Sequence, residues 1–319
     1  DRDGKIHVPI GSGNIGTANH TAISLIVAEA LRVPVDDLVV TWGGSSDTAW
    51  DFVTDASRSV HCHGKAMLNA ALDLKRQLNG AGIGSLSVGE GGRKGFVARV
   101  PVRTDFTPYY DPRLDISPLL DESTGEIKKH PTPELNPPTL KMAKKILAEG
   151  GVVGLGYYIW NPAVQAWGAS FAEVEVDMET GQVQVLKLVG AHDCGRIIHR
   201  TGAEAQVHGG MIMGLGYGAT EELPLDPNNG MPVYQTLYEY RPPSILDMPT
   251  LVPILVEAPV EAGPYGAKGL GENPMFDAAA PVVNAIYNAT GVYVREIPVT
   301  PYRVYQALKE AGKLMTREA

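Results

Sequence analysis

Residues 261–280 read Glu-Ala-Gly-Pro-Tyr-Gly-Ala-Lys-Gly-Leu-Gly-Glu-Asn-Pro-Met-Phe-Asp-Ala-Ala-Ala, and they form the most informative stretch of the chain. Four glycines and two prolines exclude an ordinary strand or helix before Asp277. One carboxylate, Glu272, stands in this backbone just before a predicted helix. Because glycine lets other groups approach the backbone closely, such a loop can fix a carboxylate against a cofactor or substrate. The alternative is a solvent-exposed loop that happens to carry a glutamate.

The bulk composition is that of an ordinary globular protein. The 319 residues are 44% apolar and 20% charged, which is enough for a sizeable core in one large domain or two. A formal net charge of −9 argues against nucleic acid as the main partner. No apolar run is long enough to span a bilayer, and no signal-peptide pattern is present. The two cysteines, Cys62 and Cys194, cannot hold an iron–sulfur cluster alone, and their low number fits a cytoplasmic location.

The first third of the chain alternates strands and helices. We expect strands at 5–10 and 38–42 and helices at 17–33 and about 56–78. Between the first strand and helix, Gly11, Gly13 and Gly16 have the spacing of a dinucleotide-binding loop. That loop also needs an acid at the end of the following strand, but here the strand ends in Trp42 and two glycines. NAD or FAD binding therefore remains only an alternative interpretation.

The remaining sequence predicts an α+β fold of two mixed α/β lobes, 1–150 and 151–319. In the first lobe, residues 79–138 indicate an extended surface excursion of the kind that contacts a partner, and a short helix is expected at 139–149. In the second lobe we expect these elements: a β-hairpin over 171–189, a glycine-rich helix at 202–217, extended segments at 231–243 and 251–259, a helix at 277–288 and a last helix capped by Thr300. Glycines are poor helix formers, so the helix at 202–217 predicts that another group approaches it closely.

Two clusters of metal-ligating residue types occur, at 61–63 and 192–194. His61 and His63 are two residues apart on a predicted helix and would point to different sides. His192 and Cys194 would share a strand face, but a zinc site needs about four ligands. We therefore expect packed or solvated side chains and no protein-ligated metal.

The sequence Asp55-Ala-Ser-Arg-Ser59 opens the second predicted helix. Its hydroxyls and carboxylate suit helix capping. The backbone amides, the hydroxyls and Arg58 together would also make an anion cradle, and the two roles are compatible. Gln206, near the start of the glycine-rich helix, can pair with a polar cofactor or face solvent.

Four blocks in a fixed order make the chain resemble the molybdenum hydroxylases of the xanthine oxidase family, and specifically the C-terminal half of their molybdopterin-binding large subunit. The blocks are Gly16-Thr-Ala18 with its following helix, Thr54-Asp-Ala-Ser-Arg-Ser59, Asp193-Cys-Gly-Arg-Ile-Ile-His199 through Gln206-Val-His-Gly-Gly210, and Gly266-Ala-Lys-Gly-Leu-Gly-Glu272-Asn-Pro274. They span nearly the whole chain.

The resemblance implies a role for each matching position. Glu272 would be the general base beside molybdenum, taking the proton from the Mo–OH ligand while hydride passes to Mo=S. Gln206 would bond the cofactor near the metal. The remaining contacts to a molybdopterin-type cofactor, with the cytosine dinucleotide form as one option, would come from Gly16, Thr17, Ala56, Ser57, Arg58, Ser59, Lys268 and Gly271. The dithiolene of the pterin would hold molybdenum, so no side chain would ligate it.

The sequence departs from the family pattern at three places. Thr17 replaces a glutamine of a Gly-Gln-Gly segment, which puts that cofactor contact in doubt. His199 and Arg200 replace Asn-Pro, and Asn273 replaces a proline after the glutamate. These changes indicate a divergent subfamily.

The resemblance also implies partners, because two cysteines exclude the family's iron–sulfur clusters from this chain. We expect a split enzyme of the nicotinate dehydrogenase type. Its partners would be a subunit with the N-terminal half of the molybdenum region, an iron–sulfur subunit and, as an option, a flavin subunit with FAD. The expected reaction is hydroxylation of an electron-poor carbon, in an N-heteroaromatic or aldehyde, with water as oxygen source. An aromatic acyl-CoA reductase-type member and a non-catalytic structural subunit are the alternatives.

Overall fold

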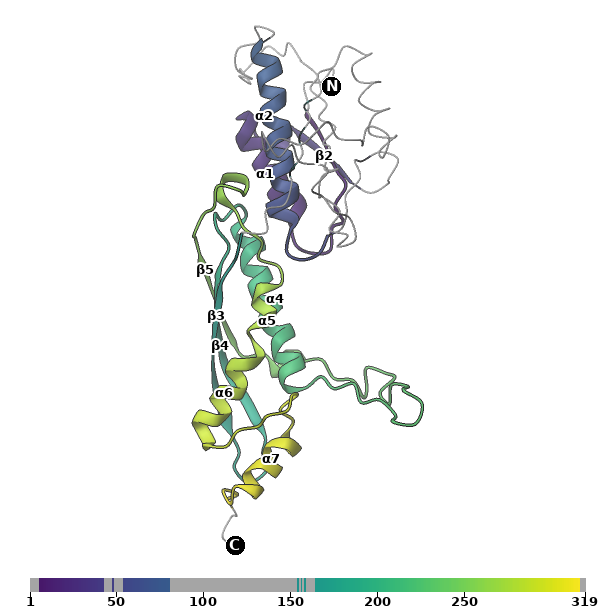
Figure 1. Ribbon diagram of the computed structural model, residues 1–319, viewed down its shortest axis with the longest axis vertical. Helices are drawn as coiled ribbons and strands as arrows, with labels where there is room; N and C mark the ends of the chain where they lie inside the picture. Colours follow the sequence, from purple (N-terminus) through teal and green to yellow (C-terminus); the bar gives the residue numbers. More distant parts are fainter. Residues whose placement is uncertain are drawn as a thin grey trace, which may run out of the picture. The chain divides into compact units, whose positions relative to one another are not determined.

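The computed structural model describes residues 6–42, 48, 54–80, 154, 156, 158 and 164–315 (Figure 1). The chain divides into two compact units. Unit 1 holds residues up to 165 together with 195–199 and 258–269; unit 2 holds 166–194, 200–257 and 270–319. The expected boundary at residue 150, the helix at 139–149 and the excursion at 79–138, apart from its first two residues in the last turn of the second helix, lie outside the described residues. The division into lobes 1–150 and 151–319 therefore stays a prediction.

Unit 1 is built on a β–α–β arrangement. Strand β1 (Ile6–Ile10) pairs in parallel with β2 (Leu38–Trp42), and helix α1 (Asn19–Leu31) connects them through the short helix η1 (Val35–Asp37). The π-helical segment η2 (Ser59–His63) then leads into α2 (Gly64–Gly80). The strands at 5–10 and 38–42 and the helix at 17–33 are thus confirmed, with ends shifted by one or two residues.

The core of unit 1 lies between this strand pair and helices α1 and α2. Its side chains are almost all aliphatic; the largest are Ile10, Ile23, Ile26, Met67 and Leu74. Each fully buried aliphatic side chain contributes about 1.5–3 kcal/mol relative to exposure. Burial of this stripe therefore fixes α1 and α2 against the strands, and with them the loops that precede each helix.

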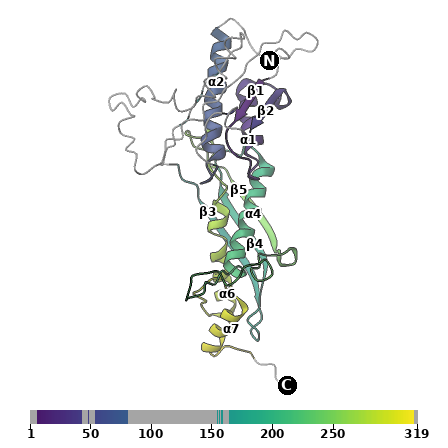
Figure 2. The ribbon, with the colours of Figure 1, turned by 90° about the vertical axis from the view of Figure 1, so that its right-hand side faces the viewer.

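Unit 2 contains a three-stranded sheet in the order β3–β4–β5. Strands β3 (Gly168–Val176) and β4 (Val183–Asp193) are antiparallel with an irregularity between Glu173 and Val174, and β5 (Thr250–Val256) is parallel to β4. Helix α4 (Arg200–Ala219) runs along the sheet (Figures 1 and 2). The predicted hairpin, the helix at 202–217 and the extended segment at 251–259 are confirmed.

The remaining elements of unit 2 are short. They are the 3-10 helix η4 (Ile245–Asp247), helix α5 (Asn273–Phe276), α6 (Ala279–Thr290) and α7 (Pro301–Glu310). The hydroxyl of Thr300 accepts a hydrogen bond from the Arg303 amide at 3.4 Å, so the predicted cap of the last helix is present. In unit 1, the 3-10 helix η5 (Pro264–Gly266) interrupts the glycine-rich loop.

Other parts of the polypeptide pack directly against the glycines of α4. A Cβ atom on Gly210 would lie 2.5 Å from Cβ of Pro274, and one on Gly218 would lie 2.8 Å from Cβ of Ala279. A Cβ on Gly214, between them, would overlap Ala278. These three positions are four residues apart and so share one helix face. The close approach predicted from the glycine content is therefore made by α5 and the start of α6.

Two predicted elements are wrong. The second helix does not begin near Ala56, because Ala56 and Ser57 are left-handed, with φ of 47° and 58°, and cannot continue a right-handed helix. The segment at 231–243 is not extended throughout. A turn forms where the Tyr240 amide donates to the Thr236 carbonyl at 3.0 Å and Glu239 accepts from the Gln235 amide at 3.1 Å.

Candidate cofactor-binding site

The first block, before α1, is a loop held in place by buried side chains. The Asn19 amide group donates to the Ser12 hydroxyl and to the Gly13 carbonyl, each at 3.2 Å, and His20 Nε2 lies 2.9 Å from the Ser12 carbonyl oxygen. Gly16 has φ of +90°, a conformation that favours glycine, and Thr17 follows it. The start of α1 therefore fixes the shape of the loop that carries both predicted cofactor-binding residues.

The second block contains backbone strain. Consecutive left-handed residues at Ala56 and Ser57 cost on the order of 1–3 kcal/mol each, a cost that proteins retain chiefly at functional sites. Arg58 and Ser59 follow, and the π-helix that begins at Ser59 is another feature found frequently at such sites. The hydroxyl of Thr54 donates to the Gly13 carbonyl at 3.4 Å, which joins this block to the first one.

The glycine-rich loop joins the second block within unit 1. A Cβ atom on Gly269 would overlap the Ser57 carbonyl oxygen and lie 3.1 Å from the Ser57 Cβ. Only glycine at 269 allows this contact. Lys268 is buried beside it, with 8% of its surface exposed.

The block at 193–199 reaches the same loop. Gly195 pairs with Ala267 in an isolated antiparallel bridge, and the Arg196 amide donates to the Gly266 carbonyl at 3.0 Å. Unit 1 therefore brings together parts of all four sequence blocks, although they are distant along the chain.

Gln206, Gly271 and Glu272 belong to unit 2. Glu272 is half-buried and directly precedes α5, where its carbonyl accepts from the Met275 amide at 3.0 Å. Gln206 is also half-buried and lies one turn before Gly210, on the face of α4 that contacts Pro274. A Cβ on Gly210 would meet Pro274 and one on Gly214 would meet Ala278, so the two segments run in the same direction, and Gln206 and Glu272 both precede these contacts in sequence.

His61 is a residue whose role the sequence did not indicate. Its Nδ1 lies 2.9 Å from the Ala267 carbonyl oxygen and its Nε2 lies 2.9 Å from the Tyr158 hydroxyl. Burial lowers the pKa of His61; the Ala267 hydrogen bond acts in the opposite direction, and the charge of Lys65 acts with burial. A neutral imidazole that donates to Ala267 and accepts from Tyr158 fits these contacts. Since the two ring partners are 206 and 97 residues away, no local pattern could have revealed them.

A second set of residues that the sequence did not indicate lies in unit 2. The Ser170 hydroxyl donates to Asp277 Oδ1 at 2.9 Å. The site of a Cβ on Gly168 would be 2.7 Å from His192 Nδ1 and 2.9 Å from Asp277 Oδ2, so the imidazole and the carboxylate are neighbours. His192 is fully buried, and burial lowers its pKa, although the Asp277 charge acts in the opposite direction.

Metal ligation by side chains was not expected. Within the described ranges, no three His, Cys, Asp or Glu side chains come together in a way that could hold a metal ion. Cys62 and Cys194 are both buried and form no disulfide, and burial raises the pKa of Cys194 to about 11. No helix in the described part of the chain has the length and apolar character needed to cross a membrane.

The architecture is that of the cofactor-binding region of molybdenum hydroxylases. The structure of CO dehydrogenase from Oligotropha carboxidovorans matches it with a TM-score of 0.70 at 21% identity, over 96% of this chain and 36% of that chain. The chain belongs to the family of molybdopterin cofactor-binding domains, whose family model matches residues 1–105 and 121–249. The predicted fold class and family resemblance are confirmed.

Two curated relatives are also similar over nearly the whole chain. The xanthine dehydrogenase molybdenum-binding subunit of Escherichia coli O157:H7 is 31% identical over 327 residues, covering 98% of this chain and 39% of the relative. The nicotine 6-hydroxylase large subunit of Paenarthrobacter nicotinovorans is 26% identical over 317 residues, covering 97% of this chain and 36% of the relative. The chain thus spans less than half the length of these relatives.

Proposed function

We propose that this chain is the cofactor-binding part of a molybdenum hydroxylase or dehydrogenase that oxidises an electron-poor carbon, with water as the oxygen source. The observation that carries the proposal is the joining of the four blocks in unit 1, through the contacts Thr54–Gly13, Ser57–Gly269 and Gly195–Ala267. The relatives named for xanthine dehydrogenase and nicotine 6-hydroxylase favour an N-heteroaromatic substrate, with an aldehyde as the second class.

Polar groups of unit 1 fit a pterin cofactor. Among the described residues, the buried Oγ1 of Thr17 and Oδ1 of Asn19 have no hydrogen-bond partner in the protein, and buried polar atoms of this kind are normally satisfied. Thr17 would therefore keep a contact to the cofactor despite replacing glutamine. Backbone and side-chain groups of Gly16, Ala56, Ser57, Arg58 and Ser59 would hold the pterin and its phosphate.

The protein groups in unit 2 would act on the reacting end of the cofactor. When bound, the cofactor would supply the oxidising centre that takes two electrons from the substrate carbon. Glu272, fixed at the start of α5, would accept the proton released as oxygen is transferred. Gln206 would orient the cofactor by hydrogen bonding, and Gly271 would position the loop before Glu272. In unit 1, Lys268 would position the part of the loop that precedes Leu270.

The proposal extends to cofactor form, partners and location. The cofactor would be of the molybdopterin type, with the cytosine dinucleotide form as one option. Iron–sulfur clusters and FAD would reside on partner subunits, and the remainder of the molybdenum-binding subunit would complete the substrate pocket. A cytoplasmic location rests on the low cysteine count.

Elemental analysis tests the proposal. The intact complex should contain molybdenum, and its oxidised extract should show pterin fluorescence, each close to one equivalent of this chain. A Thr17→Val variant should lose a large part of both, because it removes the hydroxyl and keeps the shape. Active, intact material without molybdenum or pterin would exclude the hydroxylase, as well as an acyl-CoA reductase-type enzyme of the same family.

A further inference from the structure

Residues 221–247, here called the arm, leave the end of α4 and project from unit 2 (Figures 1 and 2). The arm has its own hydrogen bonds. The Asp226 amide donates to the Met231 carbonyl and the Val233 amide to the Pro224 carbonyl, both at 2.8 Å. The Asp226 carboxylate accepts from the Asn228 amide at 2.8 Å and so closes the turn between them. The arm is therefore an ordered element with a defined tip.

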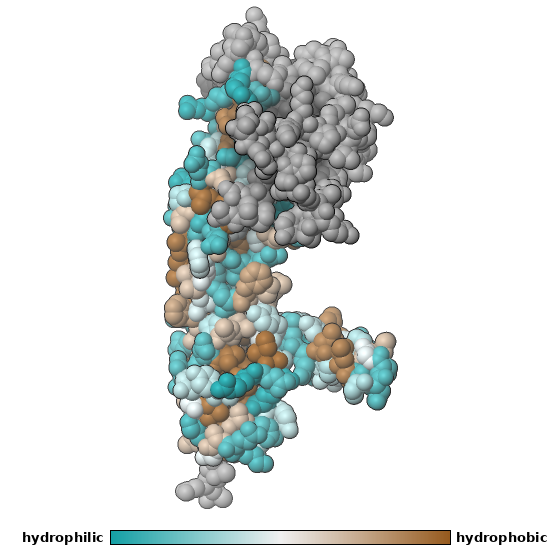
Figure 3. Space-filling view, in the orientation of Figure 1, coloured by the Kyte–Doolittle hydropathy of each residue, from teal (hydrophilic) through white to brown (hydrophobic). Residues whose placement is uncertain are grey.

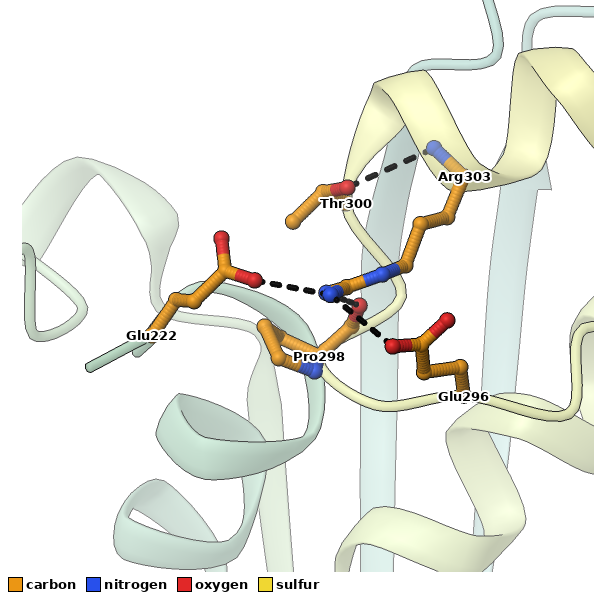
Figure 4. Close-up of polar contacts among 5 residues, drawn as sticks. All are labelled: Glu222, Glu296, Pro298, Thr300 and Arg303. Carbon is orange, nitrogen blue, oxygen red and sulfur yellow. Dashed lines mark hydrogen bonds and ion pairs between the residues drawn. The ribbon is translucent and has the colours of Figure 1, made fainter. Parts of the chain in front are cut away.

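The base of the arm is fastened to the rest of unit 2. The Tyr240 hydroxyl donates to Glu221 at 2.6 Å, which ties the returning segment to the outgoing one. Arg303, on α7, donates to Glu222 at 2.7 Å and to the Pro298 carbonyl at 2.9 Å, with Glu296 at 3.4 Å (Figure 4). An arm held this way loses little conformational freedom when it binds something.

The arm exposes large apolar side chains. Leu237 and Tyr238 are 79% and 82% exposed, and Ile245 and Leu246 are 88% and 92% exposed. Figure 3 shows hydrophobic residues gathered on the projecting part of unit 2. Scattered exposed apolar residues are ordinary, but several on one ordered projection mark an interaction surface.

The charge of the arm indicates what kind of surface it binds. The arm contains one cationic side chain, Arg241, and five carboxylates: Glu221, Glu222, Asp226, Glu239 and Asp247. Because Arg303 pairs with Glu222, the remaining four carboxylates leave the arm acidic. An acidic surface favours a basic counterpart, since complementary charge speeds and orients association. The apolar side chains need a cleft that removes them from water.

We infer that the arm docks into an apolar cleft edged by lysine or arginine on the part of the molybdenum-binding subunit that this chain does not span. The identity of the partner rests on the proposed function; the relatives are more than twice as long, so such polypeptide exists in them. The docking surface itself rests on the exposed side chains and their fixed support.

Photocrosslinking in the intact complex tests this inference. p-Benzoylphenylalanine is placed at Tyr238 or Leu246, with Tyr302 as control because it is 70% exposed on α7 and lies outside the arm. Crosslinks from both arm positions should fall in one region of the remaining subunit that is rich in aliphatic and basic residues. Crosslinks only to a second copy of this chain, or at the same level as from position 302, would overturn the inference.

Association measurements provide the second test. Leu237→Asp and Leu246→Asp should each weaken assembly with the remaining subunit by at least about tenfold, while Tyr302→Asp leaves it unchanged. Thermal unfolding of the variants should match the parent, because both side chains are solvent-exposed. Unchanged association of both arm variants contradicts docking. A complex that contains molybdenum but shows no arm crosslinks overturns the docking inference alone, whereas crosslinks in a complex without molybdenum overturn the proposed function alone.

Discussion

The imidazole of His61 joins the π-helix of unit 1 to the glycine-rich loop, with Nδ1 2.9 Å from the Ala267 carbonyl oxygen. The other ring nitrogen lies 2.9 Å from the Tyr158 hydroxyl. Because Ala267 directly precedes Lys268 and Gly269, this contact fixes the part of the loop that packs against Ser57.

Replacing His61 should therefore destabilise unit 1. His61→Ala leaves the Ala267 carbonyl without its partner and opens a cavity, so the free energy of unfolding should fall by about 2–4 kcal/mol in denaturant titrations. Tyr158→Phe removes one hydrogen bond and should cost about 1 kcal/mol. Equal stability of His61→Ala and the parent would contradict the role of this contact.

Stability should fall in mild acid. Burial lowers the pKa of both His61 and His192, so the folded protein keeps them neutral below the pH at which unfolded histidines protonate, about 6.5. The unfolded chain then binds protons that the folded chain does not, and the free energy of unfolding declines as the pH drops from about 7 to 5. Denaturant unfolding across this range measures the effect.

A substitution at His192 measures how much this residue contributes to the pH dependence of stability. His192→Gln should weaken the pH dependence, whereas Leu72→Gln, on the exposed side of α2, should keep it. A parent protein that becomes more stable between pH 7 and 5 would disprove the assignment of neutral buried histidines.

The contact between Gly269 and Ser57 predicts that alanine at two different glycine positions changes the stability in opposite directions. Gly269→Ala forces a Cβ into the Ser57 carbonyl and should cost about 1–3 kcal/mol, together with part of the bound molybdenum. Gly209→Ala, on an open face of α4, meets no atom within 4 Å and should stabilise by up to about 1 kcal/mol. Unfolding midpoints and metal content of both variants check this. If Gly269→Ala and Gly209→Ala changed the unfolding midpoint and the metal content equally, the contact with Ser57 would have no effect on stability or cofactor binding.

Glu272 provides the sharpest catalytic prediction. Glu272→Gln keeps the size of the side chain and removes its basicity, so kcat should fall by about 10²–10⁴-fold or more while molybdenum and pterin contents stay at the parent level. Steady-state turnover of the assembled complex, corrected for metal content, is the measurement. Activity within a few-fold of the parent would exclude Glu272 as the base.

The sequence predicted regular elements well and long-range contacts poorly. Apolar residues at helical spacing located α1, and short apolar runs located β1 and β2. Helix α4 was predicted from a segment rich in glycine and alanine. The start of the second helix was wrong, since the left-handed turn at Ala56 and Ser57 depends on neighbours such as Gly269 that are far along the chain.

In the candidate site, too, residues in local sequence blocks were predicted and long-range contacts were not. Glu272, Gln206 and the residues at 56–59 were identified from sequence blocks, and their roles remain predictions. His61 and His192 were expected to be packed or solvated side chains. Their partners, Ala267 and Asp277, could not be predicted, because they come close only when distant segments fold together.

The glycine face of α4 has a mechanical consequence. Gly210 and Gly214 pack directly on Pro274 and Ala278, so almost no side chains that could rearrange lie between α4 and residues 274–278. Gln206, one turn before Gly210, and Glu272, two residues before Pro274, are therefore attached to two segments that must move together as a rigid pair.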